Sequence, residues 1–189
     1  RDADDLDAAQ EATVALVANK LAIEPGMRVL DIGCGWGGAA RYLAEQAGCE
    51  VVGVTVSAEQ AKLARDTCAG LPIEIRLQDY RLVDDGPFDA ISSIGMAEHV
   101  GRRRMGDYFS ALHGLLRPRG RLLNHAISRP QHQRSRLPRR SFVNRYVFPD
   151  GELHEVGTVI TAMAGSGLEV RHAESLREHY ALTLRHWVA

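Results

Sequence analysis

Hydrophobic residues occur in two patterns that alternate along this chain. Short continuous apolar runs predict six strands, at residues 28–32, 51–56, 73–78, 88–93, 121–127 and 168–176. The stretches between them predict helices at residues 4–21, 38–47, 57–70, 104–116, 153–164 and 180–187. Strands that alternate with helices form a mostly parallel sheet with helices on both faces. The sequence therefore predicts one α/β domain, organised as a three-layer sandwich, over residues 1–189.

The junction between the first strand and the next helix carries the strongest chemical signal. From Asp31 to Gly38 the chain reads DIGCGWGG, with four glycines in six positions. Glycine allows a sharp turn and a close approach of the backbone to a ligand. The free N–H groups and the dipole of the following helix favour an anionic group at this point. We therefore expect a nucleotide-like cofactor across the carboxyl ends of the strands.

The glycine spacing alone does not identify the cofactor, because it also fits the dinucleotide fingerprint. That fingerprint requires an acidic residue at the end of the second strand, where this chain has Thr55. Acidic residues follow the first and third strands instead, at Asp31 and Asp79. This arrangement favours S-adenosylmethionine over NAD. A turn role for Asp79 is the alternative, and Ser57 with Gln60 three residues later predicts a capped helix start.

Composition fits one globular domain. The chain has 189 residues, of which 45% are hydrophobic and 25% charged. No apolar run approaches the roughly 20 residues of a membrane span. The three cysteines are odd in number and lack metal-site spacing, which indicates a reduced cytoplasmic protein. Cys34, in the glycine turn, is interpreted as a packing residue and not a nucleophile.

The net charge of −1 conceals a strongly basic segment. Residues 1–101 contain 17 acidic and 8 basic residues, whereas residues 102–145 contain 12 arginines and one acidic residue. Such a block indicates either a solvated face or an anionic partner. Within it, residues 129–145 are rich in arginine and polar residues and predict an exposed loop.

Seven segments, in one order along nearly the whole chain, resemble the cyclopropane-fatty-acyl-phospholipid synthases and their mycolic acid relatives. These segments read DIGCGWGG from Asp31, GVTVSAEQ from Gly53, QDYR from Gln78, SIGMAEHVG from Ser93, HAI from His125, YVFPDGEL from Tyr146 and YALTLRHW from Tyr180. The resemblance implies a bacterial enzyme with the Rossmann-like class I methyltransferase fold. Relatives extend beyond both ends, so we expect this chain to be a fragment whose last strand is missing.

The resemblance also implies a cofactor and a reaction. S-adenosylmethionine would contact Asp31, Gly33, Gly35, Gly37, Thr55, Val56, Gln60, Asp79, Tyr80 and Ile94. The family adds a methylene across a cis double bond of a lipid acyl chain, with a bound bicarbonate ion as the base. By position, that ion would be held by Glu98, His125, the backbone at Ile127 and Tyr180. A carboxylate, an imidazole and a phenol together fix one oxyanion by hydrogen bonds.

Each of these residues has a structural alternative. Glu98 and His99 could cap a helix, and His125 and Tyr180 could be packing residues. A metal site from Glu98, His99 and His125 lacks a spaced ligand pair, so no metal is expected.

The arginine-rich block fits an enzyme that acts on unsaturated phospholipid chains at an anionic membrane surface, on the inner face of the membrane. Nucleic acid is not expected, because few aromatic residues lie within the block. The alternatives are a C-methyltransferase that gives a methyl-branched lipid, a small-molecule methyltransferase and a non-catalytic binding fragment. The oligomeric state is not predicted.

Overall fold

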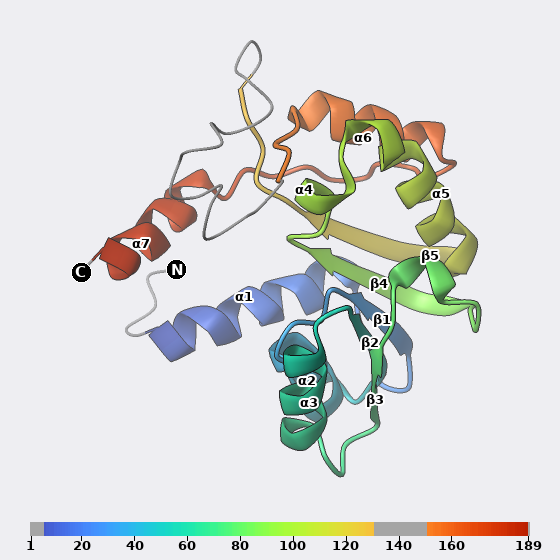
Figure 1. Cartoon of the computed structure of the whole chain (residues 1–189), viewed down its shortest axis with the longest axis vertical. Helices are drawn as coiled ribbons and strands as arrows, with labels where there is room; N and C mark the ends of the chain where they lie inside the picture. Colours follow the sequence, from blue (N-terminus) through green and yellow to red (C-terminus); the bar gives the residue numbers. More distant parts are fainter. Residues whose placement is uncertain (1–5, 131–150, 189) are drawn as a thin grey trace.

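The computed structural model describes residues 6–130 and 151–188 (Figure 1). Helices and strands alternate in the order α1 (Leu6–Leu21), β1 (Arg28–Ile32), α2 (Gly38–Ala47), β2 (Glu50–Thr55), α3 (Ala58–Thr67), β3 (Ile73–Leu77), the 3-10 turn η1 (Tyr80–Leu82), β4 (Phe88–Ile94), α4 (Ala97–Val100), the 3-10 turn η2 (Arg102–Arg104), α5 (Met105–Leu115), β5 (Leu116–His125), α6 (Val156–Gly165) and α7 (Arg177–Val188). The predicted α/β alternation is confirmed. Most of the predicted basic loop at 129–145 lies outside the described residues.

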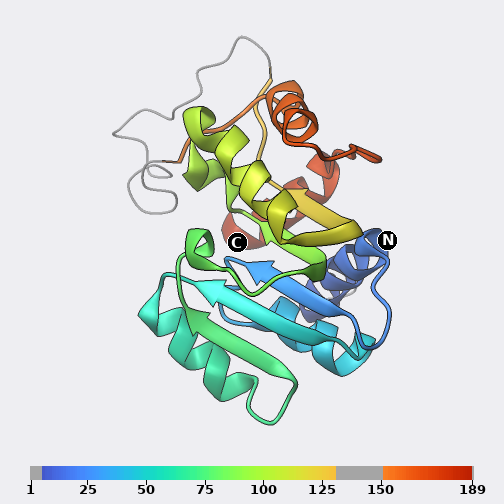
Figure 2. The ribbon, with the colours of Figure 1, turned by 90° about the vertical axis from the view of Figure 1, so that its right-hand side faces the viewer.

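Five strands form one parallel sheet in the order β3-β2-β1-β4-β5, whose twist is visible in Figure 2. The chain runs outward from β1 to β3 and then continues on the other side of β1 with β4. The strand order therefore reverses between β1 and β4. In such sheets, ligands bind outside the carboxyl ends of the strands at this switch point.

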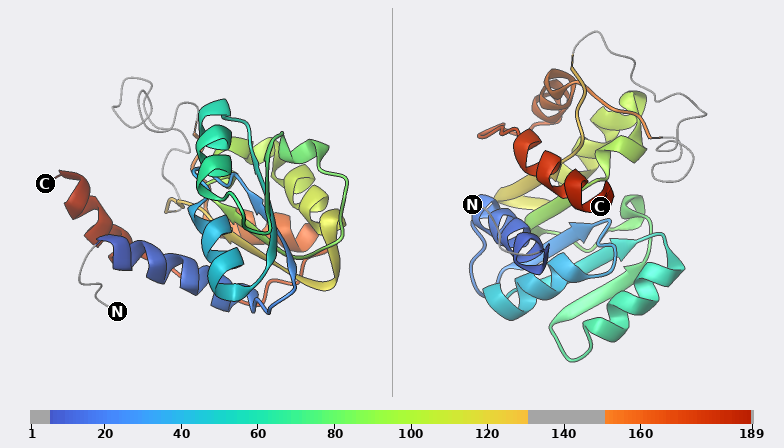
Figure 3. Two further views of the ribbon diagram at one scale, coloured as in Figure 1. Left: turned by 90° about the horizontal axis from the view of Figure 1, so that it is seen from below. Right: turned by 90° about the vertical axis from the view of Figure 1, so that its left-hand side faces the viewer.

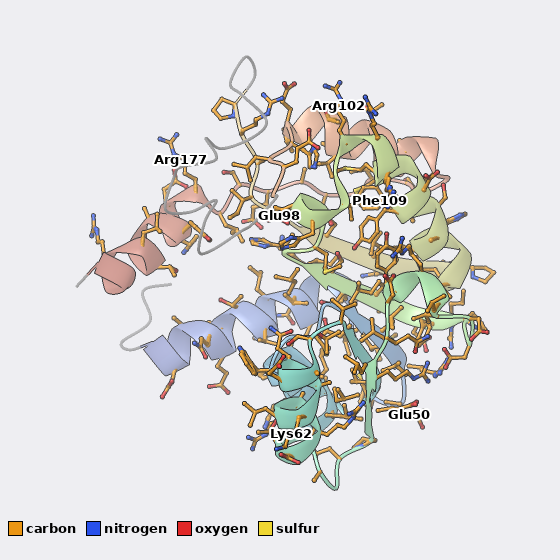
Figure 4. The ribbon with its side chains drawn as sticks, viewed as in Figure 1. Glu50, Lys62, Glu98, Arg102, Phe109 and Arg177 are labelled. Carbon is orange, nitrogen blue, oxygen red and sulfur yellow. The ribbon has the colours of Figure 1, made fainter. Side chains whose placement is uncertain are left out.

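Both faces of the sheet are covered by helices (Figures 1 and 3). Successive residues of β1 point to opposite faces: Val29 packs in a cluster with Leu43 of α2, while Leu30 packs in a cluster with Phe109 of α5. Figure 4 shows Phe109 between α5 and the sheet. Burial on both faces explains why the strands read as continuous apolar runs.

The predicted strand at residues 168–176 is wrong. This segment has no strand structure, and its Glu174 and His172 instead contact Lys20 of α1 at 2.6 and 3.3 Å. A strand requires a hydrogen-bonded neighbour, and within residues 6–130 and 151–188 the sheet ends at β5, which pairs only with β4. The sequence of this segment predicted a strand, but the described part of the chain provides no neighbouring strand for it.

The fifth strand starts earlier than predicted, at Leu116 and not at Arg121. Leu116 pairs with Phe88, and a register shift follows before Arg121 pairs with Ala90. Pro118 and Gly120 lie within this strand, where the register shift forms an irregularity at the edge of the described sheet.

Candidate active site

The glycine turn after β1 is fixed to the end of β2. The backbone N–H of Gly33 donates to the carbonyl of Val54 at 2.9 Å, and Gly33 has a φ of 72°. A Cβ at this position would lie 2.6 Å from Sδ of Met96, which follows β4. Only glycine satisfies both the dihedral angle and the contact. The turn and the loop after β4 are therefore in direct contact.

Asp31 lies in β1, two residues before this turn, and is 3% exposed. Its Oδ2 has no hydrogen-bond partner among the described residues. Burial raises the pKa of this carboxyl to about 6. A buried carboxylate oxygen without a partner is costly, so this atom fits a site for the hydrogen-bond donors of a ligand.

Thr55 and Gln60 link the end of β2 to the start of α3. The Thr55 hydroxyl donates to Oε1 of Gln60 at 2.9 Å, and the Gln60 backbone N–H donates to the Ser57 hydroxyl at 3.3 Å. The helix cap predicted at Ser57 is confirmed, although the Gln60 side chain bonds to Thr55. The adjacent Val56 is 76% exposed, an apolar surface beside the glycine turn.

Asp79 makes the contacts of a turn residue, which was the alternative to a cofactor contact. Its carboxylate accepts a hydrogen bond from the Arg81 backbone N–H at 2.9 Å and forms an ion pair with the Arg81 guanidinium at 2.6 Å. These contacts with Arg81 lower the pKa of the carboxyl. Tyr80 packs edge-on against Tyr108, with ring centroids 5.0 Å apart, and the half-buried Ile94 ends β4. Cofactor contacts of Asp79, Tyr80 and Ile94 stay predictions.

Glu98 lies in the short helix α4, beside the carboxyl ends of β4 and β5 (Figure 4). Its side chain is 4% exposed, and Oε1 accepts a hydrogen bond from the Ile127 backbone N–H at 2.7 Å. Oε2 is buried and has no partner among the described residues. Glu98 therefore does not cap a helix.

The structure brings Glu98 next to the segment that contains His125 and Ile127, because β5 ends at His125. The Ile127 backbone N–H donates to Glu98, and the expected contact of the Ile127 backbone with a bound ion stays a prediction. Tyr180 lies near the start of α7, where its backbone N–H donates to the Leu176 carbonyl at 2.9 Å. Its role in the site stays a prediction.

The segment Gly151–Glu155, named here the strap, crosses the site and was not predicted from the sequence. The Glu152 backbone N–H donates to the Glu98 carbonyl at 2.9 Å, and Oε2 of Glu152 accepts from the Arg102 backbone N–H at 3.0 Å. Its His154 is 4% exposed. A lone histidine in a sequence does not indicate burial, so only the folded structure identifies it.

Cys34 and the acidic and histidine side chains were the candidates for a nucleophile and for a metal site. Burial raises the pKa of the Cys34 thiol to about 12, and its Sγ would lie 3.1 Å from a Cβ at Gly53. These values fit a packing role. Residues 6–130 and 151–188 contain no group of three side chains placed to bind a metal ion.

A parallel sheet of this order with a glycine turn after β1 matches the Rossmann-like class I methyltransferase fold. The family model described as mycolic acid cyclopropane synthetase matches residues 1–189, and the chain belongs to this family.

Similar proteins include a probable fatty acid methyltransferase of Mycobacterium tuberculosis, 48% identical over 186 residues, which cover 96% of this chain and 43% of the relative. The cyclopropane-fatty-acyl-phospholipid synthase of Escherichia coli is 47% identical over 156 residues, which cover 82% of this chain and 40% of the relative. The crystal structure of the mycolic acid cyclopropane synthase CmaA1 complexed with SAH and CTAB matches with a TM-score of 0.88 at 34% identity, over 99% of this chain and 70% of that one. The chain thus spans less than half the length of these two curated relatives.

Proposed function

We propose that this chain carries the cofactor-binding region of an S-adenosylmethionine-dependent enzyme that adds a methylene to a cis double bond of a phospholipid acyl chain. The product is a cyclopropane fatty acid. The observation that supports this proposal is the pair of buried carboxylates, Asp31 and Glu98, at the switch point of the sheet. Each keeps one oxygen without a partner among the described residues.

The glycine turn and its surroundings fit S-adenosylmethionine. Gly33, Gly35 and Gly37 let the backbone approach the ligand, and the unpaired oxygen of Asp31 accepts its hydrogen-bond donors. The end of β2 adds further surface to this site. It offers the polar side chains of Thr55 and Gln60 and the exposed apolar side chain of Val56. Bound there, the cofactor supplies an electrophilic methyl group.

The second carboxylate fits the base of the reaction. An alkene is a weak nucleophile, and its methylation leaves positive charge on the acyl chain. Residues around this charge must exclude water and remove a proton from the new methyl group. We infer that Glu98, His125 and Tyr180 hold a bicarbonate ion as this base. The unpaired Oε2 of Glu98 fits the O–H of that ion.

We infer contact with an anionic membrane from the exposed arginines. Arg102, Arg103 and Arg104 are exposed in η2, next to α4, and Arg102 points away from the molecule in Figure 4. Basic residues near an anionic surface contribute about 1 kcal/mol each. None of the described helices is long and apolar enough to cross a membrane. From the exposed arginines of η2 we infer that the protein binds the inner, cytoplasmic face of the membrane peripherally.

A methyl-branched lipid is the second candidate product, because one relative carries the name fatty acid methyltransferase. Both products follow from the same methylated chain. Loss of a proton from the new methyl group closes the ring, whereas loss of a proton from a neighbouring chain carbon leaves a methyl-branched alkene. Which product forms therefore depends on the proton that the base near Glu98 removes.

The test is transfer of labelled methyl groups from S-adenosylmethionine to vesicles of cis-unsaturated phosphatidylglycerol, with mass spectrometry of the acyl chains. We expect each modified acyl chain to gain one CH₂ and to carry a cyclopropane ring in place of its double bond. A gain of one CH₂ with a carbon–carbon double bond retained beside the methyl branch would identify the second candidate. No transfer to vesicles, together with no binding of S-adenosylhomocysteine by calorimetry, would contradict the proposal.

A further inference from the structure

A groove separates η2 and the start of α5 from the first turns of α6, and its volume is about 520 Å³. This volume lies within the range of small-molecule sites, about 300–1,000 Å³. The Ser166 hydroxyl donates to the Gly106 carbonyl at 3.2 Å, so α6 is tied to α5, beside which it lies in Figure 1. The residues expected to bind S-adenosylmethionine or the base do not line this groove. Its polar side chains are those of Arg102, Glu155, Thr158 and Thr161, and its apolar side chains include Met105 and Ala162.

The two threonine hydroxyls in the groove are free of protein partners within the part of the chain that the structure describes. In other helices, the hydroxyls of Thr13, Thr67 and Thr183 donate to carbonyls one turn back, at 2.9, 3.0 and 3.4 Å. This is the common bond of a threonine inside a helix. Thr158 and Thr161 of α6 make no such bond within residues 6–130 and 151–188. Their hydroxyls therefore remain available to a ligand.

Arg102 supplies the positive charge of the groove. Its backbone N–H donates to Oε2 of Glu152 at 3.0 Å, whereas its guanidinium has no acceptor among the described residues. Figure 4 shows the Arg102 side chain pointing outward, at the mouth of the groove. The carboxylate of Glu155 also lines the groove, but it forms an ion pair with the Arg129 guanidinium at 2.9 Å, which compensates its charge. The groove therefore combines one free guanidinium with two free hydroxyls.

These groups suit a phosphate that is joined to an apolar body. A guanidinium and hydroxyls donate hydrogen bonds to phosphate oxygens. Met105, which is 1% exposed, and Ala162 give the same groove an apolar surface. Val156, at the start of α6, is 58% exposed and extends this surface out of the groove. A phospholipid headgroup with its glycerol has this combination of a phosphate and an apolar part.

The strap connects the groove to the buried acid of the proposed reaction. Glu155, at one end of the strap, lines the groove, and Glu152 binds both the Glu98 carbonyl and the Arg102 backbone N–H. Arg102 follows Glu98 by four residues, so their Cα atoms are at most about 15 Å apart. A lipid held by its phosphate in the groove therefore has its acyl chain within reach of Glu98.

We propose that this groove binds the phosphate of a phospholipid headgroup, with the guanidinium of Arg102 and the hydroxyls of Thr158 and Thr161 as hydrogen-bond donors. The inference rests on the proposed function and adds the place where the head of the lipid substrate is recognised. Free phosphate offers the same acceptor oxygens, so the experiment has to separate these two sources.

The test is a titration of the chain with dihexanoylphosphatidylglycerol below its micelle concentration, followed by nuclear magnetic resonance of ¹³C-labelled threonine and methionine methyl groups. Sodium phosphate and sodium chloride at equal ionic strength are titrated in parallel. We expect saturable shifts of the Thr158, Thr161 and Met105 signals with the lipid, at least about tenfold weaker binding of phosphate and no saturable response to chloride. Thr13, on α1, is the internal control and should not respond.

Variants give the second measurement. Arg102→Gln should weaken binding of the lipid about tenfold, because it removes hydrogen bonds between two charged groups, and Thr161→Val should weaken it about threefold. Arg177→Gln removes the same charge on α7, which Figure 4 shows apart from Arg102, and should change binding less than about twofold. The wild-type titration needs no variant, so a folding defect in a variant does not prevent a decision.

Phosphate that binds as tightly as the lipid would identify a free-phosphate site and overturn the lipid assignment. Lipid that leaves the Thr158 and Thr161 signals unmoved, or equal losses in Arg102→Gln and Arg177→Gln, would overturn the groove as the site. Methyl transfer to vesicles measures the proposed function separately: transfer without binding in the groove overturns this inference alone. Binding in the groove without methyl transfer or binding of S-adenosylhomocysteine overturns the proposed function instead.

Discussion

The carboxylates at the two ends of the sheet have opposite surroundings. At the amino end, Asp89 accepts a hydrogen bond from the Arg28 backbone N–H at 2.8 Å and forms an ion pair with Arg117. In the turn before β4, Asp85 pairs with the guanidinium groups of Arg28 and Arg76. At the carboxyl end, Asp31 and Glu98 are more deeply buried, and each keeps an oxygen without a partner among the described residues.

The paired carboxylates at the amino end contribute to stability, whereas the unpaired carboxylates at the carboxyl end of the same sheet are placed for function. The hydrogen bonds from Arg76 stabilise the charged carboxylate of Asp85 and lower its pKa. An unpaired buried carboxylate destabilises the fold when it ionises. Such a residue is expected where a ligand later supplies the missing donors. We therefore infer that the carboxyl end is built for ligands and the amino end for stability.

The largest expected effect is on turnover at the carboxyl end. Glu98→Gln keeps an oxygen that can accept from the Ile127 N–H but replaces the ionisable oxygen with an NH₂ group. We expect methyl transfer to vesicles to fall at least about 100-fold, the scale observed when a group that stabilises developing charge is removed. The matched change at the amino end, Asp85→Asn, should leave turnover within about twofold. Equal losses of methyl transfer in the two variants would contradict the distinction between the two ends of the sheet.

Asp31→Asn should affect stability and binding in opposite directions. The pKa of Asp31 is raised to about 6 in the fold from an ordinary value of 3.8. The native state is therefore favoured below pH 4 and loses stability as the pH rises from about 4 through 6. A shift of about two units corresponds to about 2–3 kcal/mol.

Chemical denaturation should accordingly show Asp31→Asn more stable than the wild type by about 2–3 kcal/mol at pH 7.5, with the difference disappearing near pH 4. Calorimetry should show weaker binding of S-adenosylhomocysteine by the same variant. A variant that is less stable than the wild type at pH 7.5 would show that the Asp31 carboxylate is satisfied within the fold.

The smallest expected effect is on stability at the amino end. Asp85→Ala removes the partner of two guanidinium groups, and we expect a loss of about 1–2 kcal/mol in the free energy of unfolding, because all three side chains are partly exposed. The pKa of Asp85 is lowered, mainly by its hydrogen bonds to Arg76, so this stabilisation exists above about pH 4 and is lost as the pH falls. Unfolding curves at pH 7 and pH 3 would measure it. A difference that is larger at pH 3 would contradict the ion-pair account.

The local features of the fold were predictable from the sequence, whereas its long-range contacts were not. Apolar runs and the glycine turn identified β1 and α2, and Ser57 identified the start of α3. The strand at residues 168–176 was predicted wrongly, because the local pattern of apolar residues does not show whether another strand lies beside the segment.

Prediction of the site shows the same limit. The resemblance named Glu98, but only the folded chain shows that it binds the Ile127 N–H, 29 residues further along. His154 was missed, because its burial arises from contacts of the strap with α4 and residues 128–129. The contacts of Asp79 with Arg81 in the turn were not predicted, and its contact with the cofactor stays a prediction.

The most direct test of the account is the pKa of the Asp31 carboxyl, measured by ¹³C nuclear magnetic resonance with and without S-adenosylhomocysteine. We expect a value near 6 for the free chain and a clear decrease when the ligand donates hydrogen bonds to the carboxylate. A carboxyl that titrates near 3.8 in the free chain, and does not respond to the ligand, would contradict the claim that this end of the sheet keeps an unpaired acid for the cofactor.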